Sequence, residues 1–207
     1  DKMTRVYFVS HAQPEHDWEE DRTRPLTEEG KKDSAIVLEF LKDKKIDAFY
    51  CSPYKRSMDT ITEAADFFTK EIITDERLRE REKGLDGNNH GMFRKRWADH
   101  NYHEEGGESI AMVQKRNIEA LNEILSDNTD KDIVIGTHGT ALSTILNFYD
   151  NNFGCEDFLR IIDWMPYIIE LDFESSCNEM ESECPSYSFK LIGKQEHCYI
   201  EKKFKVK

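Results

Sequence analysis

The sequence has few cysteines, and they lack the spacing that usually gives cysteine a structural role. The five thiols are an odd number, no two have CxxC spacing, and no signal peptide precedes them. We therefore expect reduced thiols in a cytoplasmic protein. Cys177 and Cys184 share one loop-like stretch in which a disulfide is conceivable, but two free thiols are the simpler expectation.

The chain also lacks long hydrophobic runs and an excess of positive charge. No apolar run approaches the roughly 20 residues that a membrane helix needs. The formal net charge is −13, and 34% of the residues are charged. A surface this acidic disfavours broad contact with nucleic acid or an anionic membrane. An anionic small molecule must then be held by a local positive pocket, and the oligomeric state stays open.

The pattern of apolar residues alternates between short strand-like runs and helical stripes. A chain of 207 residues fits one domain. Alternating strands and helices predict a single α/β domain with a mostly parallel central sheet and helices on both faces. We expect strands at 6–9, 46–50, 72–73, 133–135, 168–173 and 187–192, and helices beginning near residues 27, 54, 110 and 140.

The stretch at about 85–107 differs from the rest of the chain. It is rich in Gly, Asn, His and charge, and few apolar side chains anchor it. We predict a lid-like insertion with a short helix at 92–99. Its basic run, 94–96, is expected to be an exposed helix face rather than an attractant for an anionic substrate.

Within that stretch, three side chains have a spacing that would suit a metal site. His100, His103 and Glu104 would come together on a helical turn. The surroundings are polar and hold no further ligand cluster, so a solvated surface is the better interpretation. We expect neither a metal nor an organic cofactor.

Two segments far apart in the chain each carry a histidine where an apolar run meets a turn. His11 follows the run at 6–9, and His138 follows the run at 133–135. Ligands bind at the carboxyl ends of strands in sheets with helical crossovers. Two imidazoles at two such ends therefore indicate one shared pocket.

The residue types near these strand ends suit phosphoryl transfer from a monoester. Such a reaction needs a nucleophile, groups that hold the phosphate oxygens, and an acid for the leaving oxygen. His11 suits the nucleophile, His138 suits a donor in its imidazolium form, and the planar fork of Arg56 suits two oxygens. Glu80 is the candidate acid, with Glu82 as its local alternative.

Six short elements resemble the histidine phosphatase superfamily, in its phosphoglycerate mutase-like branch. Each is weak alone, but they occur in the family's order over roughly residues 4–150. The elements are Val9-Ser10-His11-Ala12-Gln13-Pro14, Pro25 to Gly30, Ser52 to Arg56, Leu78 and Glu80 with Gly84, Gly107-Glu108-Ser109, and Thr137-His138-Gly139.

The resemblance implies roles for these residues. His11 would be the phosphorylated nucleophile, Glu80 the proton donor, and Arg56 and His138 the phosphate pocket, with the amide of Gly139 adding a donor at a helix start. The candidates for substrate binding are Gln13, Arg22, Arg24 and Glu108. For Glu108, support of the following helix is the preferred role.

One departure from the family pattern concerns the phosphate pocket. The family's first pocket arginine falls on Ser10, which offers one hydroxyl where arginine offers a charged fork. Losing one such donor costs on the order of 3 kcal/mol of transition-state stabilisation. Three interpretations follow: Ser10 is an engineered or variant residue and the enzyme is weakened, or Arg22, Arg24 or Lys55 compensates, or phosphate is bound without efficient turnover.

We therefore expect a phosphomonoesterase that acts on a small phosphorylated metabolite through a phosphohistidine. A mutase, which returns the phosphoryl group to a second hydroxyl, needs a site that shields the phosphoenzyme from water. The alternative from another class is a phosphate-binding or regulatory domain with little turnover.

Overall fold

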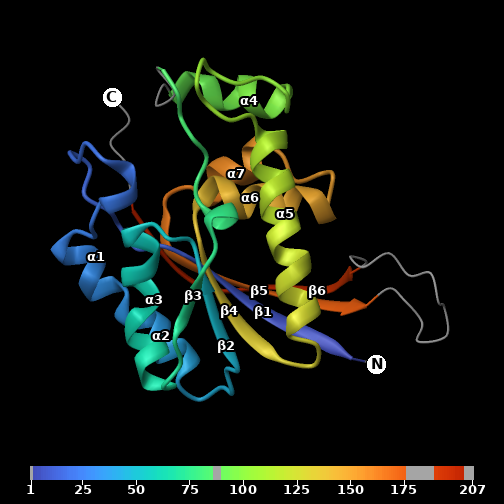
Figure 1. Cartoon of the computed structure of the whole chain (residues 1–207). Coiled ribbons are helices and arrows are strands. Elements are labelled where there is room, and N and C mark those ends of the chain that lie inside the picture. Colours follow the sequence, from blue (N-terminus) through green and yellow to red (C-terminus); the bar gives the residue numbers. More distant parts are fainter. Residues whose placement is uncertain (1, 86–89, 176–188, 203–207) are drawn as a thin grey trace.

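A twisted sheet runs through the middle of the molecule and separates two layers of helices (Figure 1). The computed structural model describes residues 2–85, 90–175 and 189–202. These described residues form a six-stranded sheet in the order β3-β2-β4-β1-β5-β6. The strands are β1 (Met3–Ser10), β2 (Ala48–Cys51), β3 (Ile72–Thr74), β4 (Asp132–Thr137), β5 (Trp164–Ser175) and β6 (Phe189–Glu201).

The first four strands are parallel to one another, as the sequence predicts. β1 pairs with β4, β4 with β2, and β2 with β3, all in parallel. β5 and β6 extend the β1 edge in antiparallel fashion. Both late strands are longer than expected, and the polar loop between them, with Cys177 and Cys184, lies outside the described residues.

The helices cover both faces of the sheet, which confirms the expected layers. One face carries α1 (Glu28–Asp33), α2 (Ala35–Leu41) and α3 (Lys55–Phe67). The other carries α5 (Ile110–Asp127), α6 (Gly139–Tyr149) and α7 (Cys155–Ile161), and α4 (Phe93–Ala98) lies beyond the start of α5 (Figure 1). Three short 3-10 turns, η1 (Asp21–Thr23), η2 (Glu76–Leu78) and η3 (His90–Met92), lie in the connections.

The central strands are apolar without interruption because both of their faces are buried. Phe8 of β1 and Ile135 of β4 pack into the core formed with α5, α6 and α7. Their neighbours Val9 and Val134 pack into the core formed with α2 and α3. This is the pattern expected for parallel strands between two helical layers.

The sheet register brings the ends of β1 and β4 together. Ser10 pairs with Thr137, so the residues that follow, His11 and His138, leave the sheet at one edge. On the other side of β4, Gly136 allows close packing against β2, because a Cβ there would lie 2.5 Å from the Cys51 sulfur. The strand order therefore places the two histidines beside each other before any side-chain contact is considered.

The segment at about 85–107 packs more tightly than its composition suggests. Its short helix is confirmed as α4, and Trp97 is buried against Phe153 and Phe158. The expectation of a solvated surface is wrong for Arg96 and Glu104, which are buried and paired with each other. Residues 86–89 lie outside the described part, and the role of the segment as a lid stays a prediction.

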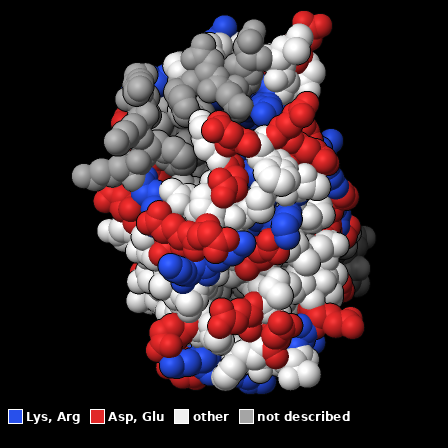
Figure 2. Space-filling view, turned by 90° about the vertical axis from the view of Figure 1, so that its left-hand side faces the viewer, with Lys and Arg blue, Asp and Glu red and all other residues white. Residues whose placement is uncertain are grey.

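The surface carries both signs of charge. Figure 2 shows Asp and Glu side chains spread over the face that carries α1 and α3, with Lys and Arg between them. Arg94 shows this mixing on another part of the surface, since it pairs with Glu156 in the open. Among the described residues, no helix combines the length and the apolar character that crossing a membrane requires.

Candidate active site

The two histidines predicted from the sequence lie against each other. The ring centroids of His11 and His138 are 5.2 Å apart, and the ring planes meet at 66°. Both side chains are buried, with His11 8% and His138 0% exposed. The pair lies where β1 and β4 end, the edge at which parallel sheets bind ligands. The fold therefore brings the two histidines together at this edge, and their role in one phosphate pocket stays a prediction.

The imidazole of His11 is held in one tautomer. Its Nδ1 lies 2.8 Å from the carbonyl oxygen of Ala12, and a carbonyl only accepts, so Nδ1 carries the proton. Burial, together with the nearby Arg56 charge, lowers the pKa of His11 to about 3. At neutral pH the ring is uncharged, and the lone pair of Nε2 is free for nucleophilic attack.

His138 is an uncharged imidazole at neutral pH. Burial first, and then the charges of Arg56 and its neighbours, hold its pKa well below the ordinary value. This differs from the expected imidazolium. Its Nε2 lies 2.7 Å from Ser52 Oγ, which also accepts from the Tyr54 amide. Either Ser52 or Nε2 supplies the proton of this hydrogen bond, and Nδ1 has no partner among the described residues.

Arg56 reaches the site from the first turn of α3. Its Nη1 donates to the backbone carbonyl of Asp21 at 2.7 Å and lies 3.1 Å from the Asp21 carboxylate. Its guanidinium also lies over the Tyr54 ring, 5.2 Å from the centroid, and Tyr54 meets His138 edge-on. Arg56 is only 5% exposed, so the candidate phosphate ligand is buried and already paired with an anion of the same chain.

Ser10 directly precedes His11, and the three cations predicted to compensate for the absent arginine differ in their partners. Ser10 is 5% exposed. Arg24 is close enough for its charge to lower the pKa of His11, and it donates to the carbonyls of residues 15 and 16. Arg22 pairs with Glu76, and Lys55 pairs with Asp59. Of the three, Arg24 is the best candidate for a compensating cation, because its charge acts on His11.

Gln13 and the Pro25–Gly30 element hold the chain after His11. Thr27 donates to the Gln13 side chain at 2.9 Å and caps α1 by accepting from the Gly30 amide. A Cβ on Gly30 would lie 2.3 Å from the Gln13 carbonyl oxygen, so only glycine allows this approach. The predicted substrate contact Gln13 therefore has a structural partner within the chain, and its contact with a substrate stays a prediction.

The Glu80 side chain reaches the start of α6, the helix that directly follows His138. Its carboxylate accepts from the amides of Thr140 and Ala141, each at 3.0 Å, and from its neighbour Arg81 at 2.8 Å. Oxygen Oε2 has one of these donors and Oε1 has two. The N-terminus of a helix favours a negative group, which explains the position. The alternative acid Glu82 lies 3.5 Å from the Tyr54 hydroxyl and is more exposed.

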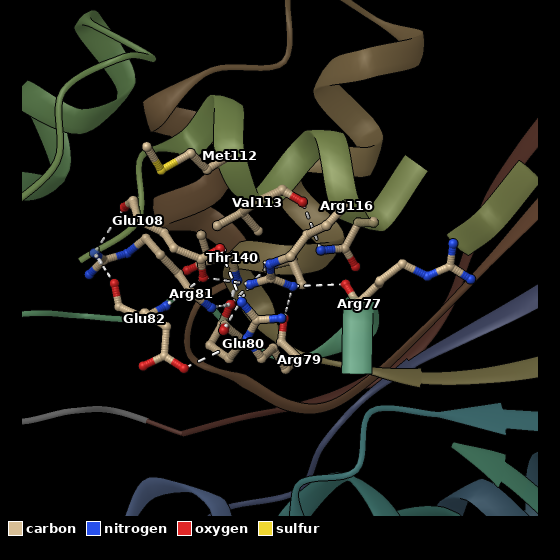
Figure 3. Close-up of polar contacts among 12 residues, drawn as sticks. Arg77, Arg79, Glu80, Arg81, Glu82, Glu108, Met112, Val113, Arg116 and Thr140 are labelled. Carbon is tan, nitrogen blue, oxygen red and sulfur yellow. Dashed lines mark hydrogen bonds and ion pairs between the residues drawn. The ribbon is translucent and has the colours of Figure 1, made fainter. Parts of the chain in front are cut away.

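The Glu108 carboxylate is bound by other groups of the chain. It makes two contacts of 2.9 and 2.8 Å with Arg116 and accepts from the Glu82 amide at 2.9 Å (Figure 3). Its neighbour Ser109 caps α5 by accepting from the Met112 amide. The preferred structural role for Glu108 agrees with these contacts.

The described residues hold no cluster of His, Cys, Asp or Glu that suits a metal ion. Of the three side chains with ligand-like spacing, His100 packs against Trp97 and His103 contacts the Glu104 carbonyl. The Glu104 carboxylate is paired with Arg81 and Arg96. Arginine pairing occupies the oxygens that a metal would need.

Several residues that contact the site residues were given no role in the sequence analysis. Ser52 and Tyr54 contact His138 and lie inside an element that the sequence already marks, so they could have been found. Thr60 accepts from the Ala12 amide at 3.0 Å. Asp21 and Arg116 carry no local signal, since their partners lie far away in the sequence.

Comparisons with known proteins agree with this geometry. The chain is 28% identical over 154 residues to phosphoserine phosphatase 1 of Hydrogenobacter thermophilus, an alignment that covers 66% of this chain and 71% of the relative. It resembles a mycobacterial glucosyl-3-phosphoglycerate phosphatase with a TM-score of 0.71 and 16% identity, over 91% of this chain and 97% of the other.

A second solved structure with this fold is a mutant phosphoserine phosphatase of Entamoeba histolytica bound to phosphoserine. The TM-score is 0.71, with 19% identity over 92% of this chain and 96% of the other. Residues 6–162 match the model of the histidine phosphatase superfamily (branch 1). That span runs from β1 to α7 and contains every residue of the candidate site, and the chain is a member of the histidine phosphatase superfamily.

Proposed function

We propose that this chain hydrolyses phosphomonoesters of a small metabolite through a phosphohistidine on His11. The observation that carries the proposal is the buried, uncharged His11 ring. Its Nδ1–H donates a hydrogen bond to the Ala12 carbonyl oxygen, which leaves the lone pair on Nε2. The adjacent His138 and Arg56 supply donors for the phosphate oxygens.

The reaction proceeds in two displacements at phosphorus. In the first, Nε2 of His11 bonds to phosphorus while the ester P–O bond breaks, and the Glu80 carboxyl group gives its proton to the leaving oxygen. In the second, water attacks phosphorus, its proton goes to the Glu80 carboxylate, and the P–N bond breaks. Inorganic phosphate leaves, and His11 and Glu80 return to their first states.

The phosphate oxygens are held by groups from three elements. The planar fork of Arg56 binds two oxygens once the substrate replaces Asp21. His138, beside the ring of His11, donates to a third, together with the first amide of α6. A Cβ on Gly139 would meet nothing within 4 Å, so space is available at this helix start.

Ser10 weakens this pocket but does not abolish it. One charged donor is missing, and removing a single such donor typically lowers turnover by about 10²- to 10³-fold. Arg24 compensates in part, because its charge already acts on His11 and its guanidinium is anchored beside the same loop. The protein is therefore a slow phosphatase rather than an inert phosphate receptor.

The substrate belongs to the class of small phosphorylated metabolites. The first compounds to test are phosphoserine, which the Hydrogenobacter relative is named for and the Entamoeba protein binds, and 3-phosphoglycerate. An aryl phosphate serves as the generic substrate.

The proposal is tested by trapping the phosphoenzyme. Wild-type protein is mixed with each phosphoester and quenched, and acid-labile phosphate on the protein is measured together with free phosphate. We expect a phosphohistidine and steady phosphate release, both lost in His11→Ala. Isomer exchange without free phosphate would indicate a mutase instead. Ligand binding without any covalent phosphate would contradict the proposal.

A further inference from the structure

We propose that Arg116 is a positioning residue for Glu80, the proton donor of the proposed function on which this inference rests. Arg116 lies on the long helix α5, in the layer that packs against α6. Its contacts hold the backbone of the turn before Glu80, so that the Glu80 carboxylate meets the start of α6.

The guanidinium of Arg116 binds three backbone carbonyl groups of that turn. Nη1 donates to the carbonyl oxygens of Arg77 at 2.8 Å and Arg79 at 2.6 Å, and Nη2 donates to the carbonyl of Glu80 at 3.0 Å. Figure 3 shows these contacts converging on one side chain. Three charge-assisted hydrogen bonds to backbone atoms fix the path of the chain rather than any one rotamer.

Glu108 sets the orientation of this guanidinium. It binds Nε of Arg116 at 2.9 Å and Nη2 at 2.8 Å, which is the two-point contact that a planar fork and a carboxylate prefer. The same carboxylate accepts from the Glu82 amide. Arg116 therefore holds the chain up to Glu80, and Glu108 holds the chain two residues beyond it. Both side chains are largely buried, at 11% and 14% exposure.

The side chain of Glu80 is bound to the start of α6, at the edge of the sheet that carries His11 and His138. Its carboxylate accepts from Thr140 and Ala141, the second and third residues after His138. The backbone of Glu80 is thus tied to α5 and its carboxylate to α6. Proton transfer to a leaving oxygen requires placement to within a fraction of an ångström, and a displacement of about 1 Å can cost roughly 100-fold in rate.

Arginine suits this task better than lysine. The five donors of the guanidinium serve three carbonyls and one carboxylate at once, whereas an ammonium group is a point charge with three donors. Arg116→Lys should therefore retain only part of the kcat on the alkyl ester that Arg116→Gln loses. Arg77 provides a matched control, because it also joins the turn to α5, through Glu123, but its side chain makes no contact with Glu80.

The kinetic test compares substrates that differ in their need for an acid. An alkyl phosphate needs its leaving oxygen protonated, whereas a nitrophenyl phosphate has a stable leaving group and needs little help. We expect Arg116→Gln to lower kcat for the alkyl ester by about tenfold to a hundredfold, with KM and the aryl rate changed far less. Arg77→Gln should leave the ratio of the two rates unchanged.

A double variant shows whether Arg116 acts through Glu80. In a Glu80→Gln background, Arg116→Gln should cause little further loss on the alkyl ester, since coupled residues are not additive. Equal losses on both esters, or a full further loss in the Glu80→Gln background, would overturn the proposal. Thermal unfolding checks folding, and Arg116→Lys and Glu108→Gln give the same readouts if Arg116→Gln does not fold.

A measurement without turnover separates this proposal from the proposed function. The amide resonances of Thr140 and Ala141 report their bonds to the Glu80 carboxylate. We expect both to shift in Arg116→Gln as they do in Glu80→Gln, and to stay in place in Arg77→Gln. Unmoved amides would refute the positioning role even in an active enzyme. Moved amides in a protein without phosphatase activity would leave the placement of Glu80 supported and refute the function.

Discussion

Arg56 and Asp21 are bound to each other at the centre of the site. Nη1 of Arg56 donates to the Asp21 carbonyl at 2.7 Å and lies 3.1 Å from its carboxylate. Arg24 also lies near that carboxylate, with Nε at 3.4 Å. The short turn η1 therefore brings a negative group of the chain to the arginine that would bind phosphate, and any anionic ligand has to compete with it.

Removing the Asp21 charge should strengthen anion binding. In Asp21→Asn the side chain no longer competes as an anion for Arg56, while the backbone contact remains. A hydrogen bond to a charged group contributes about 1.5–3 kcal/mol, so we expect phosphate or vanadate to bind about tenfold to a hundredfold more tightly. Titration calorimetry measures this. Asp17→Asn, an exposed position on the same loop, serves as the control and should bind as the wild type does.

Restoring the missing arginine should raise turnover. Ser10 is buried and directly precedes His11, at the position where the resemblance to the family implies an arginine. We expect Ser10→Arg to increase kcat on an aryl phosphate by as much as about 100-fold. Ser10→Met has similar length without charge, so it separates charge from packing. A gain in both variants, or in neither, would show that the lost charge does not limit the rate.

Ser52 should matter for both activity and stability, since it is the partner of a buried imidazole. Ser52→Ala leaves Nε2 of His138 without its hydroxyl contact. An unsatisfied buried polar group costs about 1–3 kcal/mol of unfolding free energy, and the loose ring should lower kcat. Denaturant unfolding and aryl phosphate turnover measure the two effects. Ser57→Ala removes a buried hydroxyl that binds the Thr137 carbonyl instead, and should lower stability with a smaller loss of turnover.

The stability of the protein should fall on mild acidification. Burial, assisted by Arg56, lowers the pKa of His11 from 6.5 to about 3. Between these values the unfolded chain binds more protons than the folded one, so the contribution is complete above pH 6.5 and is lost as the pH falls towards 3. The unfolding free energy should drop by up to ~1.4 kcal/mol per pH unit for each such histidine.

Denaturant unfolding between about pH 7.5 and about pH 5 measures this slope. In His11→Gln the slope should be shallower than in the wild type. His16→Gln removes an exposed histidine and should keep the wild-type slope. An unchanged slope in His11→Gln would contradict the neutral, buried state of the ring.

The order of the elements and the edge that carries the site follow from local patterns. The runs before His11 and His138 are apolar on both faces, which requires a layer of helices on each side and therefore a parallel sheet. Parallel strands end at a common edge, so the two rings had to lie near each other. The packing of the segment around α4 does not follow from its composition. The polar composition indicates an exposed segment, whereas Arg96 and Glu104 are buried as a pair whose charges are compensated only after folding.

The sequence by itself determined the sheet, its catalytic edge and the residue types available there, because strand and helix periodicity and short motifs are local properties. Only the tertiary structure decided that Asp21 pairs with Arg56, that the Ala12 carbonyl sets the tautomer of His11, and that Arg116 holds the turn of Glu80. Two of these depend on the path of loops between distant elements, and the third on the angle of one ring. Such relationships arise from packing, which no local pattern in the chain records.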